Sequence, residues 1–214
     1  MNMPSNESFS EEELDILQEV MNVSFGQATS DLAELIDIYV VLNVPEIKLI
    51  PAEDLPGYIQ ETIKDYKTTS IVAQSYWGKF KGNALLIFPS GAGRELITML
   101  DPEANEPASG DQLNVLEDET LVEVGNILIG ACISKLSEML NDHTAYSPPK
   151  VISHDSSESS LFENIIKPNH SAITMNTVFS FEGRNINGYL FLINDPESIK
   201  WLKIALHTFM EQYE

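Results

Sequence analysis

Two pairs of glutamate and asparagine are the residues of this sequence best suited to chemistry. The first pair is Glu19 and Asn22, and the second is Glu123 and Asn126. Residues three apart lie on the same face of a helix, so each pair would present a carboxylate and a carboxamide together. A carboxamide can orient a water molecule for attack on a phosphoryl group, as a glutamine does in GTPases. Phosphoryl hydrolysis is therefore the chemistry that the two pairs favour.

The chain lacks the other groups that most enzyme mechanisms need. Cys132 is the single cysteine, lies on the apolar side of its predicted helix and cannot form a multi-thiolate metal site. The four histidines form no motif, and there is no P-loop, dinucleotide fingerprint or His/carboxylate metal spacing. We therefore expect no metal site and no cofactor of the chain's own. In a phosphoryl reaction the partner protein would supply the Mg²⁺ and the neutralising cation.

The charge balance excludes several classes of partner. Among 214 residues, Asp and Glu number 33 and Lys and Arg number 12, for a formal net charge of -21. Such a chain repels nucleic acids and anionic membrane surfaces. The first basic residue is Lys48, so the start of the chain has no positive signal region, and we find no apolar run long enough to span a membrane. We expect a cytoplasmic protein.

A repeat organises the elements that must position the two pairs. When the sequence is shifted by 104 residues against itself, eight of the 18 positions from 17 to 34 are identical, and Pro45 falls on Pro149. A second similarity joins residues 82–88 with 188–194, at a slightly different offset. The repeat predicts one domain over residues 1–214, built from a first repeat (10–100), a linker (101–112) and a second repeat (113–214). Each half has few predicted strands, so we expect one shared core.

Each repeat is predicted to begin with a long helix that carries one of the pairs. Ser10 and Glu13 form a capping box, so the first helix should start near Glu11. The second long helix is expected over residues 113–140. Strands are expected at 38–49, 69–76, 83–88, 172–181 and 187–193, and shorter helices at 91–100 and 196–212. The predicted fold class is α+β, a pseudo-two-fold duplication with two long helices packed on an extended, mostly antiparallel sheet.

Further residues extend each pair into a polar stripe along its helix. Asp15 and Gly26 lie in line with the first pair, and Glu119 and Gly130 with the second. A glycine one turn beyond each asparagine has no side chain, which would let another surface approach closely. We therefore expect these four residues to contribute to binding.

The spacing of these residues resembles the motif of a known family. The motif is Asp/Ser-x₃-Glu-x₂-Asn, followed after 22 residues by a proline. It is matched here by Asp15, Glu19, Asn22 and Pro45, and again by Glu119, Glu123, Asn126 and Pro149. This doubled pattern resembles the CheC/CheX/FliY family of bacterial chemotaxis phosphatases, in its two-motif CheC type. Two departures are Glu119 at the first motif position and Met21 where a glycine often precedes the asparagine.

The resemblance implies a function and a role for each motif residue. It implies dephosphorylation of phosphorylated CheY or a related response regulator, with asparagine orienting the water and glutamate docking the partner. Glu19, Asn22, Glu123 and Asn126 would be catalytic, Pro45 and Pro149 structural, and Mg²⁺ would come from the receiver domain. We expect a monomer.

Two alternatives remain open at this point. The chain could be a non-catalytic interaction module that binds or sequesters a response regulator or a CheD-like deamidase. It could also be an acidic adaptor whose match to the motif is accidental. Turnover of phosphorylated receiver by substoichiometric protein would separate catalysis from binding.

Overall fold

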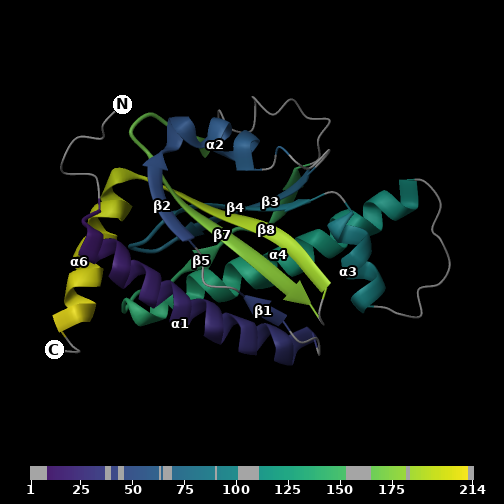
Figure 1. The fold of residues 1–214 in the computed structure, drawn as a ribbon, viewed down its shortest axis with the longest axis horizontal. Helices are drawn as coiled ribbons and strands as arrows, with labels where there is room; N and C mark the ends of the chain where they lie inside the picture. Colours follow the sequence, from purple (N-terminus) through teal and green to yellow (C-terminus); the bar gives the residue numbers. More distant parts are fainter. Residues whose placement is uncertain are drawn as a thin grey trace.

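The elements of the fold follow the predicted order (Figure 1). The structure is a computed structural model, and it describes residues 9–36, 40–42, 46–62, 64, 69–89, 91–100, 111–152, 165–181 and 184–211. The helices are α1 (Glu11–Ile36), a 3₁₀ turn η1 (Ala52–Asp54), α2 (Leu55–Thr62), α3 (Ala92–Leu100), α4 (Asp111–Met139) and α6 (Pro196–Glu211). The strands are β1 (Val40–Leu42), β2 (Glu46–Pro51), β3 (Thr69–Trp77), β4 (Gly82–Pro89), β5 (Ala145–Tyr146), β6 (Lys150–Ile152), β7 (Ser171–Phe181) and β8 (Arg184–Asn194).

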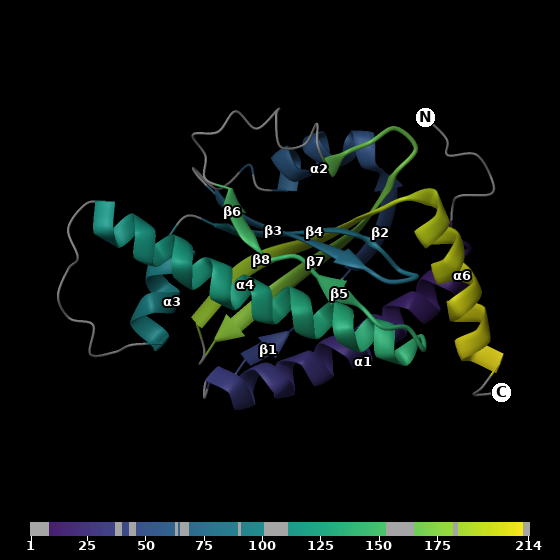
Figure 2. The ribbon, with the colours of Figure 1, turned by 180° about the vertical axis from the view of Figure 1, so that it is seen from behind.

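The strands form one antiparallel sheet of eight, in the order β1-β7-β8-β4-β3-β5. At one edge β2 also pairs with β7, and at the other β6 also pairs with β3. The long helices α1 and α4 contact each other and lie on one side of the sheet, while α2 lies on the other (Figures 1 and 2). The expected α+β fold, with two long helices packed on an antiparallel sheet, is therefore confirmed.

The central strand β4 shows why its sequence is apolar throughout. Ala84, Leu86 and Phe88 pack in the cluster that includes α1 and α4, whereas Leu85 and Ile87 pack in the cluster with α2. All five are buried. A strand covered on both faces loses the polar alternation of a half-exposed one, so the continuous apolar run reflects two cores that share one sheet.

The first long helix begins where its capping box predicts. The Ser10 backbone N–H donates to Glu13 Oε2 at 2.7 Å, and the Glu13 N–H donates to Ser10 Oγ at 3.1 Å. Leu17, Met21 and Phe25 recur every four residues as an apolar stripe along α1, and all three are buried in the cluster shared with α4. The capping box therefore sets the start of α1, and the stripe sets which of its faces meets the core.

The second long helix is more apolar than its motif residues suggest. By length and composition alone, Leu113–Met139 is long and apolar enough to cross a membrane, which corrects the expectation that no such segment exists. In its most apolar window 56% of the residues are buried in the fold, and the helix packs against α1 and the sheet. This is the usual environment of a core helix, and Cys132 is buried there as expected.

The remaining differences from the predicted elements concern short segments. The helix α2 and the strands β5 and β6 were not predicted, and α4 begins at Asp111, within the predicted linker. The single strand expected at 38–49 is two strands, β1 and β2. The eight residues of α2 bury Leu55 and Ile59 over the far face of the sheet. Residues 101–110, 153–160 and Pro45 lie outside the described residues.

Candidate functional site

The first Glu/Asn pair lies on the half of α1 that faces away from the core. Glu19 is exposed, as is Asp15 one turn earlier, while Asn22 is half-buried. The Oδ1 atom of Asn22 is buried and has no hydrogen-bond partner among the residues that the structure describes. Glu19 is thus free to meet a partner, and Asn22 sits at the boundary between core and surface.

An apolar pocket of about 500 Å³ lies directly beside the first pair. Three helices line it, α1, the end of α4 and the end of α6, and Glu19 is its one charged lining residue among those described. The other lining residues are Ile16, Val20, Val23, Met139, Phe209 and Met210. The first pair is therefore flanked by a surface that can accept an apolar side chain.

The second pair lies on α4, and its asparagine is held by a residue that the sequence did not point to. Glu123 and Asn126 are both exposed. The Nε2 atom of Gln74 on β3 donates to Asn126 Oδ1 at 2.8 Å and to the backbone carbonyl of Ser147 at 2.9 Å. Gln74 is only 3% exposed. A polar residue at a buried position of β3 was the available signal, because such a side chain needs a partner.

The glycines near the two asparagines differ in their surroundings. A Cβ atom at Gly125 would lie 2.8 Å from Val72 Cγ1, so this glycine lets α4 lie close against β3. The equivalent residue of α1 by the repeat is Met21, which is buried. At Gly26 and Gly130 a Cβ would meet nothing within 4 Å. These two positions are open, as close approach of another surface would require.

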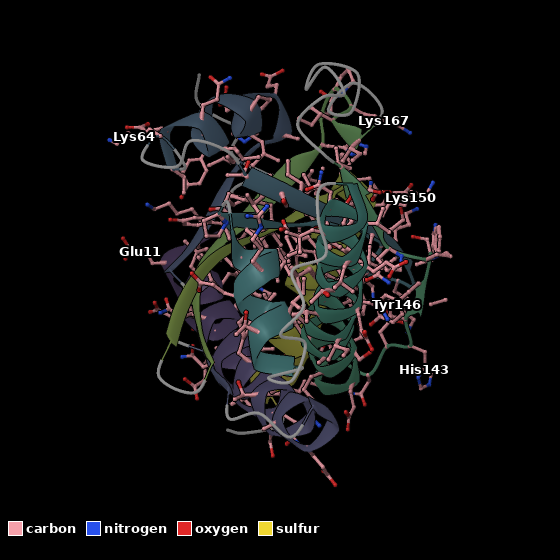
Figure 3. The ribbon with its side chains drawn as sticks, turned by 90° about the vertical axis from the view of Figure 1, so that its right-hand side faces the viewer. Glu11, Lys64, His143, Tyr146, Lys150 and Lys167 are labelled. Atoms are coloured by element: carbon pink, nitrogen blue, oxygen red, sulfur yellow. The ribbon has the colours of Figure 1, made fainter. Side chains whose placement is uncertain are left out.

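The outer side of α4 is held by the segment that follows it. We name residues Ala145–Ile152, which include β5 and β6, the strap. Its Tyr146 hydroxyl donates to the Gly130 carbonyl at 3.3 Å and lies 2.7 Å from Ser134 Oγ. Figure 3 shows Tyr146 and Lys150 of the strap beside α4. Pro149 lies in the strap between β5 and β6 and is half-buried.

The two long helices offer little positive charge to a phosphate. Lys135 is the one Lys or Arg within α1 and α4, and its Nζ lies 2.9 Å from Glu138 Oε2. Near the start of α4, Glu119 is exposed, and burial together with the charge of Glu117 raises the pKa of Asp118. Across the described ranges, no three His, Cys, Asp or Glu side chains are grouped to hold a metal ion. The chemistry of the pairs suits orienting a water or a lysine, and the two helices provide little positive charge to neutralise a phosphate.

Sequence comparison relates the chain to proteins of bacterial chemotaxis. No protein-family model matches it. It is 25% identical over 203 residues to the CheY-P phosphatase CheC of Bacillus subtilis, covering 92% of this chain and 94% of CheC. It is 23% identical over 152 residues to the flagellar motor switch phosphatase FliY of the same organism, covering 70% of this chain and 38% of FliY.

Comparison of structures gives the same fold. The crystal structure of Thermotoga maritima FliY matches with a TM-score of 0.67 at 17% identity, over 94% of this chain and 98% of that one. The complex of CheX with CheY, BeF₃ and Mg²⁺ from Borrelia burgdorferi matches with a TM-score of 0.51 at 18% identity, over 82% and 98%. The chain is therefore homologous to CheC and FliY of Bacillus subtilis and has the fold of Thermotoga maritima FliY.

Proposed function

We propose that this protein hydrolyses the aspartyl phosphate of a CheY-type response regulator. The observation that carries the proposal is the Glu/Asn pair present on both long helices, with both glutamates exposed, in a chain homologous to a CheY-P phosphatase along almost its whole length. The homologue acts on CheY-P and the neighbouring CheX is found with CheY, which supports a receiver domain as the partner.

In this proposal the asparagine positions the water and does no covalent chemistry. Asn126 would enter the receiver's active site and accept a hydrogen bond from the attacking water through Oδ1. Asn22 would do the same after its side chain rotates, because its Oδ1 is buried in the free protein. The water oxygen forms a bond to phosphorus while the bond from phosphorus to the Asp carboxylate oxygen breaks. The products are inorganic phosphate, which carries both protons of the water, and a free Asp carboxylate on the receiver.

The positive charges of the reaction would belong to the receiver. Its Mg²⁺ and an active-site lysine would neutralise the phosphoryl group, and Glu19 or Glu123 would dock against that lysine. This division agrees with the near absence of basic residues on α1 and α4 and with the net charge of -21. We further propose that the protein works as a cytoplasmic monomer without a cofactor of its own.

The decisive experiment is the decay of phosphorylated CheY in the presence of Mg²⁺ and a tenfold deficit of this protein. We expect the wild type to accelerate decay by about 10- to 100-fold, or roughly 1.4–3 kcal/mol of barrier. Asn22→Ala and Asn126→Ala should each retain turnover, and the double variant should be inactive while remaining folded by circular dichroism.

Other outcomes would change the proposal in defined ways. If one single variant is already inactive, the other helix serves only for docking. If the wild type binds CheY-P but accelerates nothing at any ratio, the protein is a non-catalytic binding module, and the proposed hydrolysis is wrong.

A further inference from the structure

The strap contains a bulge next to the second asparagine. Tyr146 pairs with Tyr76 of β3, and Lys150 pairs with Ala73. Between these pairs the strap has three residues, Ser147 to Pro149, opposite only two on β3, Gln74 and Ser75. Bulges of this kind often re-aim a group beside an active site, and they tolerate proline, which has no N–H for the ladder.

The bulge turns the Ser147 carbonyl away from the backbone of β3. Ser147 N–H donates to the Ser75 carbonyl at 2.9 Å, as in a regular ladder. The return bond is different, because the Ser75 N–H donates to the Ser147 side-chain Oγ at 3.0 Å. The Ser147 carbonyl is then available to accept from Gln74 Nε2 at 2.9 Å. Ser147 precedes Pro148, which restricts its backbone to extended conformations and favours this arrangement.

That carbonyl determines the orientation of two side-chain amides. A backbone carbonyl only accepts, so the Gln74 atom that contacts it must be the NH₂ nitrogen. The same nitrogen lies 2.8 Å from Asn126, and the Asn126 atom it meets must therefore be the acceptor Oδ1. The contacts from Ser147 through Gln74 thus determine which end of each amide is the NH₂ group, and they leave Gln74 Oε1 buried without a partner among the described residues.

We propose that Gln74 is a positioning residue for Asn126, oriented by the Ser147 carbonyl of the bulge. The proposal rests on the proposed function and adds a named support to its second site. Gln74 occupies one lone pair of Asn126 Oδ1 and leaves the second lone pair for the attacking water. The Asn126 NH₂ group is left to donate to a phosphoryl oxygen of the receiver. A side chain held in this way loses less conformational freedom when the complex forms.

The test uses the Asn22→Ala background, in which the second site alone would turn over. In that background Gln74→Met removes the amide at similar volume and should lower kcat for phosphorylated CheY about 10-fold, with KM unchanged. Gln74→Glu should lower kcat further, because a carboxylate repels both Oδ1 and the Ser147 carbonyl. The matched control is Thr174→Val on β7, at a buried polar position on the α2 side of the sheet, and its kcat should equal that of the background.

Two results would overturn the proposal. One is a kcat that does not change on Gln74→Met. The other is an equal fall of kcat in the Asn126→Ala background, which would indicate a general loss of structure.

A second measurement keeps the test independent of activity. Scalar couplings that report the χ1 angle of Asn126 should show one rotamer in the wild type and averaging in Gln74→Met. Averaged couplings already in the wild type would refute the positioning role. If the couplings behave as expected but the Asn22→Ala protein has no turnover, the proposed hydrolysis at this site is wrong while the positioning remains.

Discussion

At the residue scale, the glycines of the two long helices fall into two kinds. Gly125 is required by packing, because a Cβ there would lie 2.8–3.0 Å from three atoms of Val72. Gly26 and Gly130 face open space, so packing within the chain does not explain them. A glycine inside a helix costs about 1 kcal/mol relative to alanine. The chain therefore carries a stability cost at two positions beside the candidate sites.

These surroundings predict opposite effects of the same substitution. Gly125→Ala should destabilise the fold by about 1–3 kcal/mol, since α4 must move away from β3. Gly26→Ala and Gly130→Ala should each stabilise it by up to about 1 kcal/mol, because the helix propensity gain meets no clash. Urea denaturation of the three variants measures the difference. A Gly125→Ala protein as stable as Gly130→Ala would contradict the close packing of α4 on β3.

At the scale of elements, a charged cluster joins α1 to α6. Glu13 lies 3.3 Å from Lys203 Nζ and 3.2 Å from His207 Nε2, and it also accepts from the Ser10 backbone N–H. Burial alone would raise the pKa of Glu13, but the Ser10 hydrogen bond and the charge of Lys203 outweigh it and lower that pKa below 4.5. Glu13 therefore both caps the start of α1 and attaches α6 to it.

The lowered pKa predicts how this attachment depends on pH. A carboxyl whose pKa is lower in the folded state stabilises the fold above its unfolded pKa, and the contribution disappears as the pH falls through the folded value. At pH 7, Glu13→Gln should cost about 1 kcal/mol of unfolding free energy. That difference from the wild type should shrink between pH 5 and pH 3 in denaturant titrations followed by circular dichroism. A difference that is constant over this range would exclude an ionised Glu13 as the cause.

Local patterns predicted the elements well, and contacts between distant segments were not predictable. Ser10 and Glu13 predicted the start of α1 because a capping box is complete within four residues. The partners of Glu13 on α6 are almost 200 residues away, and no periodicity encodes them. Gln74 is similar, because its hydrogen-bond partners are Asn126 on α4 and Ser147 in the strap, both more than 50 residues away. The short helix α2 was missed because eight residues carry too little periodicity.

At the scale of the whole molecule, the net charge of -21 opposes compaction. Repulsion among exposed charges acts over the Debye length, which falls from about 30 Å at 0.01 M salt to about 10 Å at 0.1 M. We therefore expect the melting temperature to rise by about 2–5 °C over this range of NaCl. Differential scanning calorimetry measures it, with KCl as a control for ion-specific effects. A melting temperature that falls with salt would mean that attractive ion pairs dominate.

The strand order has a consequence for how the protein is made. The early strands β1 and β2 pair with β7, and Lys48 lies opposite Thr174. Conversely, β5 and β6 from the second half of the chain pair with β3 from the first half. Neither half can complete its own sheet edge while it emerges from the ribosome. The native pairing of β1 and β2 must therefore wait until β7 has been translated, whereas β3 and β4 can pair as soon as both have emerged.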